Sequence, residues 1–308
     1  PHPGAHAGTG AVLHGHTGIE AIIIRHKMKR GLVLEGGAMR GMFTAGVIDV
    51  MMEHGITFDG IVGVSAGAAF GVNYKSHQIG RAIRYNERFC NDKRYCSIRN
   101  LFRDGNLYSK DFCYGEVPLV HDPFDFEAYE ANPMEFHIVC TDIVTGKPHY
   151  HVFKGRDDHE FDWIRASASM PLVSEIVEIE GKKLLDGGIS DAIPLQYFES
   201  IGYKRNLVIL TQHAEYDKKE SVAMPFIRLL YRKYPALIQA MEVRHLMYNA
   251  QRDYVNRQEA AGNALVIRPT EPLPVKRLTK DPAVLRATYN IGRATAEKRL
   301  DDIRNYLG

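Results

Sequence analysis

Short apolar runs alternate with helical patterns from residue 28 onward. Residues 31–34 form an apolar run that meets a glycine-rich turn, and residues 42–54 then show a helical pattern that Gly55 closes in a C-cap position. The same order follows at once, because residues 61–64 are typical of a strand and residues 66–74 of a helix. Two such units in about 45 residues predict parallel strands with helices packed on the sheet.

The remainder of the chain continues this mixed pattern. Further strands are predicted over 136–143, 149–153, 175–179, 183–185, 207–211 and 265–267. Helices are predicted over 164–169, 225–258 with a break near Pro235, and 281–307. The pattern predicts an α/β fold with a mostly parallel central sheet between helical layers, and a helical C-terminal extension.

Residues 63–67, Gly-Val-Ser-Ala-Gly, place Ser65 at the end of the second apolar run. Small residues and serine are common in ordinary strand-to-helix turns, so the pentapeptide has a purely structural explanation. The functional interpretation is a nucleophile elbow, in which Gly63 and Gly67 avoid collisions and the turn exposes the serine hydroxyl. The two readings must be separated by the rest of the chain.

The first glycine-rich turn, residues 35–41, has the sequence Glu-Gly-Gly-Ala-Met-Arg-Gly. Adjacent glycines between a strand and a helix leave backbone N–H groups that bind negative charge. The turn matches neither dinucleotide nor P-loop spacing, so a nucleotide site is poorly supported. It fits an oxyanion hole with Arg40 beside it, and we expect Gly37 to adopt a backbone conformation open only to glycine. Carboxyl ends of parallel strands share one sheet edge, so this turn and Ser65 are expected side by side.

A third turn, Asp186-Gly187-Gly188, follows a predicted strand. On its own it would be an ordinary turn. Together, and in this order, the glycine-rich turn with Arg-Gly, the G-x-S-x-G elbow and the D-G-G turn resemble the motifs of the bacterial patatin-like phospholipase family, over roughly residues 28–195. The helical C-terminal third is similar to that of such proteins, but less specifically.

The resemblance implies a three-layer α/β/α patatin-like sandwich and a lipid acyl hydrolase with a serine–aspartate dyad. Ser65 would be the nucleophile and Asp186 its base. The backbone amides listed next would form the oxyanion hole: Gly36, Gly37 and Ala38. Supporting roles would fall to Arg40, Gly63, Gly67, Gly187 and Gly188. A dry site would raise the pKa of the aspartate, and the helix dipole would stabilise the developing serine anion.

This chain departs from the family pattern at two positions, with Ala38 where many relatives have glycine and Glu35 where aspartate is frequent. An amide donor remains at Ala38, so the hole is expected to survive. Three rivals stay open: an acyltransferase with the same dyad, a carboxylesterase with a Ser-His-Asp triad, and a non-catalytic lipid-binding protein. His213 is the best triad candidate, because it follows both Asp186 and a predicted strand.

Composition narrows the setting. The 308 residues are 45% hydrophobic and carry a formal charge of +2, which favours no particular partner. Four scattered cysteines without zinc-type spacing predict a reducing, cytoplasmic location and neither metal nor other cofactor. No nucleic-acid motif is present. Residues 1–27, rich in glycine and histidine, are interpreted as a disordered leader derived from a tag or vector, residues 28–195 as the core domain and 196–308 as the remaining strands and helices packed on it.

Two segments suggest peripheral contact with an anionic membrane, on its inner face. Residues 75–110 carry nine Lys or Arg against three Asp or Glu, interleaved with aromatic residues. Residues 225–247 mix apolar and basic positions, as an interfacial helix does. Both patterns also fit solvated or core-packed helices. The oligomeric state and the natural lipid are not encoded in any of these patterns.

Overall fold

The computed structural model describes residues 28–157 and 159–308. Its centre is one sheet of eight strands in the order β5-β6-β3-β2-β1-β7-β8, with β4 paired to β3. The strands are β1 (Lys29–Leu34), β2 (Gly60–Val64), β3 (Glu135–Asp142), β4 (Lys147–Val152), β5 (Val177–Ile179), β6 (Lys182–Asp186), β7 (Tyr203–Ile209) and β8 (Ala264–Ile267). The predicted leader, residues 1–27, lies outside the described residues.

The five strands from β3 to β8 in this order are parallel, and β4, β5 and β6 add an antiparallel edge. Strands β3 and β4, predicted over 136–143 and 149–153, form an antiparallel hairpin around Gly146. The predicted fold class, an α/β sandwich with a mostly parallel central sheet and a helical C-terminal extension, is confirmed.

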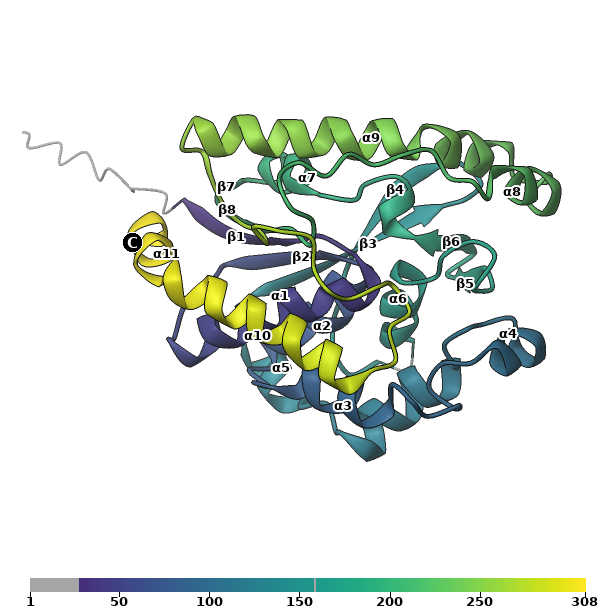
Figure 1. The fold of residues 1–308 in the computed structure, drawn as a ribbon, viewed down its shortest axis with the longest axis horizontal. Coiled ribbons are helices and arrows are strands. Elements are labelled where there is room, and N and C mark those ends of the chain that lie inside the picture. The colour runs from purple at the N-terminus through teal and green to yellow at the C-terminus, as the bar shows by residue number, and fades with distance from the viewer. Residues whose placement is uncertain (1–27, 158) are drawn as a thin grey trace, which may run out of the picture.

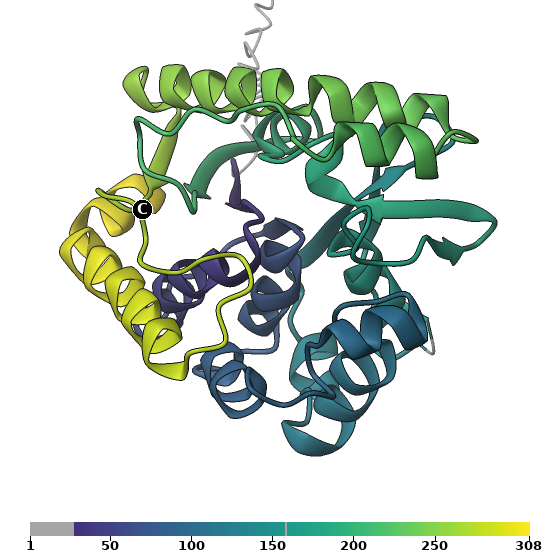
Figure 2. The same cartoon turned by 45° about the vertical axis from the view of Figure 1, so that its right-hand side comes forward.

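Helices cover both faces of the sheet (Figure 1). They are α1 (Gly41–Glu53), α2 (Ala66–Lys75), α3 (Arg81–Phe89), α4 (Ile98–Asp104), α5 (Phe126–Ala131), α6 (Glu160–Ser167), α7 (Leu195–Ser200), α8 (Met224–Leu230), α9 (Pro235–Ala260), α10 (Pro282–Lys298) and α11 (Leu300–Leu307). Helices α7 and α9 lie on one side of the sheet and α1, α2 and α10 on the other, as the turned view in Figure 2 also shows.

Alternation along the strands explains these layers, because neighbouring strand residues point to opposite faces. Leu32 and Leu34 of β1 pack with Phe43 of α1 in one buried cluster, whereas Val33 packs with Phe198 of α7 in another. All five side chains are fully buried. The buried part of this central strand, residues 31–34, therefore has no polar side chain, which is why it forms a continuous apolar run in the sequence.

The segment between α2 and β3 differs most from the sequence expectation. Three α-helices, α3, α4 and α5, and a π-helix (Phe112–His121, η2) lie there, and none of them was predicted. Polar residues, a proline at 118 and short lengths conceal their period. The final predicted helix, 281–307, is broken at Arg299 into α10 and α11. Within the described residues, no helix combines the length and apolar character that crossing a membrane requires.

Candidate active site

Ser65 occupies a sharp turn between β2 and α2. Its backbone angles are φ 55° and ψ −121°, a region that residues with a side chain rarely adopt and that costs on the order of 1–3 kcal/mol. The turn is held by Ser167, whose hydroxyl accepts the Ser65 N–H at 2.8 Å and donates to the Val139 carbonyl at 2.6 Å. A strained, braced serine at a strand-to-helix turn is the geometry of a nucleophile elbow.

Close packing explains the two glycines that flank the elbow. A Cβ atom on Gly63 would lie 2.7 Å from the backbone of Ala68, and one on Gly67 would lie 2.5 Å from the carbonyl oxygen of Leu34. Helix α2 therefore starts directly against β1 and β2, with no space for side chains at these positions. Both glycines lie where the sequence predicted a supporting role for them.

Sheet register brings Asp186 next to Ser65. In β3, Val139 pairs with Val64 of β2, and the next residue, Cys140, pairs with Asp186 of β6. Strands β2 and β6 therefore pair with successive parts of β3, and β6 occupies the part beyond the end of β2. Ser65, the residue after Val64, then lies next to Asp186, the last residue of β6. Ser65 and Asp186 line the same small pocket.

The Asp186 carboxyl is buried and tightly held. It accepts the Gly188 N–H at 2.7 Å, while the Asp186 backbone N–H donates to Ser169 at 2.8 Å. Burial raises its pKa, and the charge of Arg244, then a hydrogen bond from Ser65, lower it again. A carboxylate with a raised pKa beside a serine hydroxyl is suited to general-base work.

The D-G-G glycines make this placement possible. A Cβ on Gly187 would collide with the carbonyl oxygen of Val139, and a Cβ on Gly188 would lie 3.0 Å from the Asp186 carboxyl. The η3 turn (Gly187–Ile189) therefore folds tightly under the aspartate. Both residues stand where the sequence predicted support for Asp186.

The glycine-rich turn after β1 lies against the elbow. A Cβ on Gly36 would lie 3.0 Å from the Ser65 Cβ. The N–H groups of Gly36, Gly37 and Ala38 donate to no atom within the described residues. Amides without an internal acceptor, next to a serine, are groups that could form an oxyanion hole.

The conformations in this turn differ from the sequence expectation. Gly37 has φ 165°, an extended value open to any residue, so the predicted glycine-only backbone is wrong. Glycine is required there by contact instead, because a Cβ would lie 2.6 Å from the Thr211 hydroxyl. The residue with a left-handed backbone is Ala38, at φ 49°. The family's frequent glycine at this position is explained by that angle.

Glu35 has a larger role than the sequence suggested. Its buried carboxyl accepts the Thr211 N–H at 2.6 Å and the Tyr248 hydroxyl at 2.6 Å. It therefore ties the glycine-rich turn to the end of β7 and to α9. Burial raises its pKa despite these hydrogen bonds. Its partners come from more than 170 residues away, so no local pattern could have revealed them.

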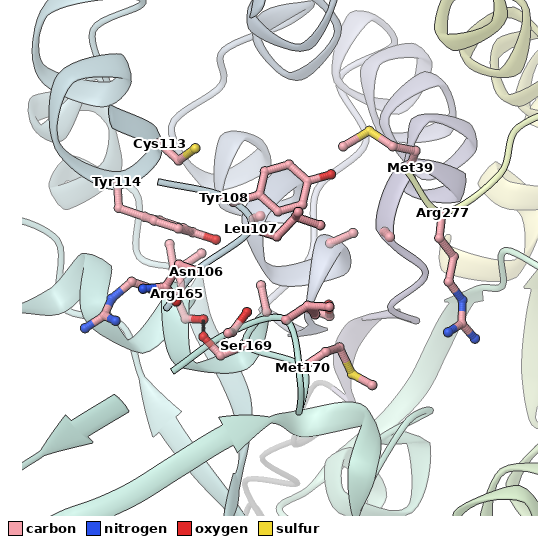
Figure 3. Close-up of a pocket in the computed structure, with 18 of the residues that line it drawn as sticks. Met39, Asn106, Leu107, Tyr108, Cys113, Tyr114, Arg165, Ser169, Met170 and Arg277 are labelled. Atoms are coloured by element: carbon pink, nitrogen blue, oxygen red, sulfur yellow. Dashed lines mark hydrogen bonds between the residues drawn. The ribbon is translucent and has the colours of Figure 1, made fainter. Parts of the chain in front are cut away.

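A large apolar cavity of about 430 Å³ opens at Ser65. Figure 3 shows part of its lining, including Tyr108, Tyr114 and Met170. Its walls are mostly apolar or aromatic and include Met39, Leu107, Tyr108, Tyr114, Val117, Ile164, Met170 and Ile227. Four arginines line it. Arg165 is paired with Asp162 and Glu175, and Arg81 with Asp122, whereas Arg244 and Arg277 also line the second pocket described next. The cavity has the size and character of an acyl-chain site.

A second pocket of about 80 Å³ lies on the other side of Ser65 and is polar. The dyad residues, the glycine-rich turn and Glu35 line it, together with four basic side chains: Arg40, Lys218, Arg244 and Arg277. Only Arg40 was predicted at the site. The other three come from the loop after β7, from α9 and from the loop after β8, where their sequence neighbourhoods resemble ordinary surface.

No histidine of the described chain lines either pocket. His213, the triad candidate, interacts with Glu215 at 3.0 Å instead. His149 and His151 both stack on Trp163. The described residues contain no cluster of three or more His, Cys, Asp or Glu side chains arranged to hold a metal ion. The structure thus brings Ser65 together with Asp186 and not with His213.

Known proteins similar to this chain were found by sequence and by structure. It is 28% identical to the uncharacterized protein YjjU of Escherichia coli (strain K12), over 85% of this chain and 74% of that protein. It is also 28% identical to lysophospholipase nte1 of Aspergillus fumigatus, over 56% of this chain but 11% of that protein. VipD from Legionella pneumophila is similar in structure, with a TM-score of 0.44 and 11% identity over 90% of this chain and 67% of VipD.

Two family descriptions match different parts of the chain. A domain of unknown function, DUF6363, matches residues 234–308. The description "Patatin-like phospholipase" matches residues 32–199, which contain the elbow, the glycine-rich turn and Asp186. Because this match covers more than half of the 308 residues, the chain belongs to the patatin-like phospholipase family, the family of lipid acyl hydrolases predicted from its motifs.

Proposed function

We propose that this protein hydrolyses acyl esters of lipids through an acyl-enzyme on Ser65, with Asp186 as the base. One observation carries the proposal: Ser65 stands where an apolar cavity meets a polar pocket that holds a buried carboxyl and three free amides. The acyl chain occupies the apolar cavity, and the ester carbonyl lies between Ser65 and the glycine-rich turn. The name of the fungal relative, a lysophospholipase, supports this substrate class.

The reaction follows from the placement of the groups. The Ser65 oxygen attacks the ester carbonyl carbon while its proton passes to Asp186. The resulting oxyanion accepts hydrogen bonds from the amides of the glycine-rich turn, each of which typically contributes about 10²–10³ in rate. The tetrahedral intermediate collapses, the C–O bond to the alcohol breaks, and the alcohol leaves with the proton from Asp186. Water then attacks the acyl-enzyme, giving its proton to Asp186, and the fatty acid leaves as Ser65 regains its hydrogen.

Labelling with a fluorophosphonate probe tests the nucleophile directly. Wild type is expected to form a covalent adduct that peptide mass spectrometry locates on Ser65, whereas Ser65→Ala remains unlabelled. A control serine is available at Ser174, which lines the apolar cavity away from the dyad; Ser174→Ala should label like wild type. An adduct on any other residue, or equal labelling of Ser65→Ala, would show that the nucleophile lies elsewhere.

We further propose that the mouth of the apolar cavity contacts a membrane surface. The cavity wall includes Asn106 and Leu107, just after α4, and Ile227 of α8. The outer faces of these two helices carry exposed apolar side chains: Ile98, Phe102, Phe226, Leu229 and Leu230. Both helices project at the same end of the molecule, on either side of β5 and β6 (Figure 1). Exposed apolar and aromatic groups beside basic ones are typical of interfacial helices.

The charge contribution is smaller than the sequence suggested. Arg94 pairs with Asp92 at 2.7 Å and Arg103 with Asp104 at 2.6 Å, so apolar contact has the larger share. The double variant Phe102→Ser/Phe226→Ser is expected to sediment less with anionic vesicles than wild type does. Ile201→Ser, an exposed residue just after α7, is the matched control. Equal sedimentation of wild type and double variant would contradict membrane contact at this rim.

A further inference from the structure

Four basic side chains converge on the small pocket beside Ser65. Arg40 follows the glycine-rich turn, Lys218 lies in the loop before α8, Arg244 is on α9 and Arg277 is in the loop before α10. They face two carboxyls, Glu35 and Asp186, so the pocket has an excess of positive charge.

These four side chains lack acidic partners within the described residues, since none of them lies within 4.0 Å of a carboxylate oxygen there. Arg244 makes one hydrogen bond, from Nε to the Gly188 carbonyl at 2.8 Å. The buried Nε of Arg40 has no acceptor in the described chain. Lys218 Nζ lies 4.7 Å from the centroid of the Tyr248 ring, and it makes no hydrogen bond or ion pair to an oxygen of the described residues. By contrast, Arg81 and Arg165 in the apolar cavity are both paired.

Holding these charges together has a cost that a ligand would offset. Burial and the neighbouring charges of Arg244 and Arg277 lower the pKa of Lys218 to about 7. Burial also lowers the pKa of Arg244 and of Arg40. Unpaired like charges gathered at one place destabilise a fold unless an anion neutralises them. Arginine and lysine donors converging from four segments are the usual recognition chemistry for phosphate.

We propose that Arg40, Lys218, Arg244 and Arg277 form a subsite for the phosphate of the substrate's headgroup, so that the preferred substrate is an acyl ester of a glycerophosphate. The inference rests on the proposed acyl hydrolase function. The acyl chain lies in the apolar cavity, the ester at Ser65, and the leaving alcohol carries its phosphate into the charged pocket. Lys218, Arg244 and Arg277 lie outside residues 32–199, so the chain beyond the patatin match completes the site.

Matched substrates test the subsite. The probes are a monoacylglycerol phosphate and the monoacylglycerol with the same acyl chain, both below their aggregation concentrations. Wild type should have a kcat/KM that is at least about tenfold higher for the phosphate ester, the gain expected for a charge-assisted hydrogen bond. In Lys218→Met and in Arg277→Gln, the ratio of the two kcat/KM values should fall about tenfold.

Neighbouring residues supply controls of equal charge change. Lys219 pairs with Asp217 and Lys276 is exposed, and neither lines the pocket. Lys219→Met and Lys276→Gln should keep the wild-type ratio. If Lys218→Met and Arg277→Gln lower kcat/KM equally for both esters, the cations act on the reacting oxygen and the headgroup assignment is wrong.

Free phosphate is the other source of this chemistry, and calorimetry on Ser65→Ala separates the two. We expect that inorganic phosphate binds more weakly than glycerol phosphate does, with both signals reduced by Lys218→Met. Binding of inorganic phosphate without any ester preference in wild type would indicate a free-anion site and overturn the headgroup assignment. If wild type hydrolyses neither ester, the proposed hydrolase function fails and the assignment falls with it. Hydrolysis of both esters without preference defeats the headgroup assignment alone.

Discussion

The two pockets that meet at Ser65 differ in how their charged residues are used. The larger one, about 430 Å³, has mostly apolar walls, and the two arginines that line it alone, Arg81 and Arg165, are paired with acidic side chains. Arg244 and Arg277 line both pockets. The smaller one, about 80 Å³, is polar, and its four basic side chains have no such partners in the described chain. Paired arginines support a wall, whereas unpaired ones are available to a ligand. The Ser65 hydroxyl, the proposed nucleophile, therefore lies between a surface suited to an acyl chain and one suited to an anion.

The contrast also separates two parts of the chain. Most of the apolar wall comes from residues 38–174, within or next to the patatin match, while three of the four cations come from beyond residue 199. In the proposed function, ester cleavage and the selection of the charged group therefore depend on different regions of the chain. Each of the following experiments changes either Ser65, where the two pockets meet, or one of the two pockets.

Removing the Ser65 hydroxyl, where the two pockets meet, should have the largest effect. Ser65→Ala is expected to abolish hydrolysis of every ester, with or without phosphate, because both pockets serve one nucleophile. Folding should persist, because alanine differs from serine only by the missing hydroxyl, and the hydrogen bond that is lost contributes about 1 kcal/mol to the free energy of unfolding. Activity is measured with a small soluble ester and stability by thermal unfolding. Retained turnover in a purified, unlabelled Ser65→Ala variant would mean that the two pockets do not meet at the reacting atom.

The second largest effect is expected from Asp186, the buried carboxyl of the small polar pocket. Asp186→Asn should lower kcat by about 10²–10⁴, the usual contribution of a general base. The asparagine oxygen can still accept the Gly188 N–H, so the turn should remain intact. His213→Ala is the control, because His213 contacts Glu215 and lines neither pocket. A loss in His213→Ala as large as that in Asp186→Asn would restore the triad and remove the dyad from consideration.

The two pockets also differ in how many of their residues could be predicted from the sequence. Ser65, Asp186 and the glycine-rich turn were predicted because each depends on a few adjacent residues at a strand end. The register that pairs Val139 with Val64 and Cys140 with Asp186 follows from the order of the strands in the sheet, which the sequence pattern did not specify. Lys218, Arg244 and Arg277 were missed because only the tertiary fold gathers them. The helices between α2 and β3 were missed because buried polar residues such as Asn86 and Arg81 interrupt their apolar periodicity.

A smaller change should sharpen the apolar side. Ala69 lies one helical turn after Ser65 and lines the large cavity. Ala69→Leu is expected to lower kcat/KM for long-chain esters at least about tenfold more than for short-chain esters, since a few methylenes change binding by this order. Ala294→Leu makes the same change on the exposed face of α10 and should leave the chain-length profile unaltered. An unchanged profile in Ala69→Leu would place the acyl chain outside this cavity.

The effect of the Arg244 charge on the pKa of Asp186 predicts a shift in the pH dependence of activity. Asp186 must be deprotonated to act as base, so activity rises with pH through its pKa. Among the groups that lower this pKa, the charge of Arg244 acts most strongly and that of Arg277 less. Arg244→Gln should therefore move the acidic limb of the kcat/KM profile to higher pH, and Arg277→Gln should move it less. The profile is measured with a neutral soluble ester. A shift to lower pH in Arg244→Gln would contradict the proposed coupling to Asp186.

The smallest expected effect concerns Ala38, which lines both pockets and has φ 49°. A left-handed backbone costs a residue with a Cβ about 1–2 kcal/mol, and Ala38→Gly removes that cost. Glycine also gains freedom in the unfolded chain, which costs about 0.4–1 kcal/mol, so the net change in unfolding free energy is a gain of about 0.5 kcal/mol. The amide donor stays in place, and kcat should be unchanged or slightly raised. Ala250→Gly, on the exposed face of α9, lacks the strain and should instead lose about 0.5–1 kcal/mol, as chemical denaturation would show. Equal destabilisation by both substitutions would mean that Ala38 carries no strain, and that the turn shared by the two pockets is as relaxed as an ordinary helix.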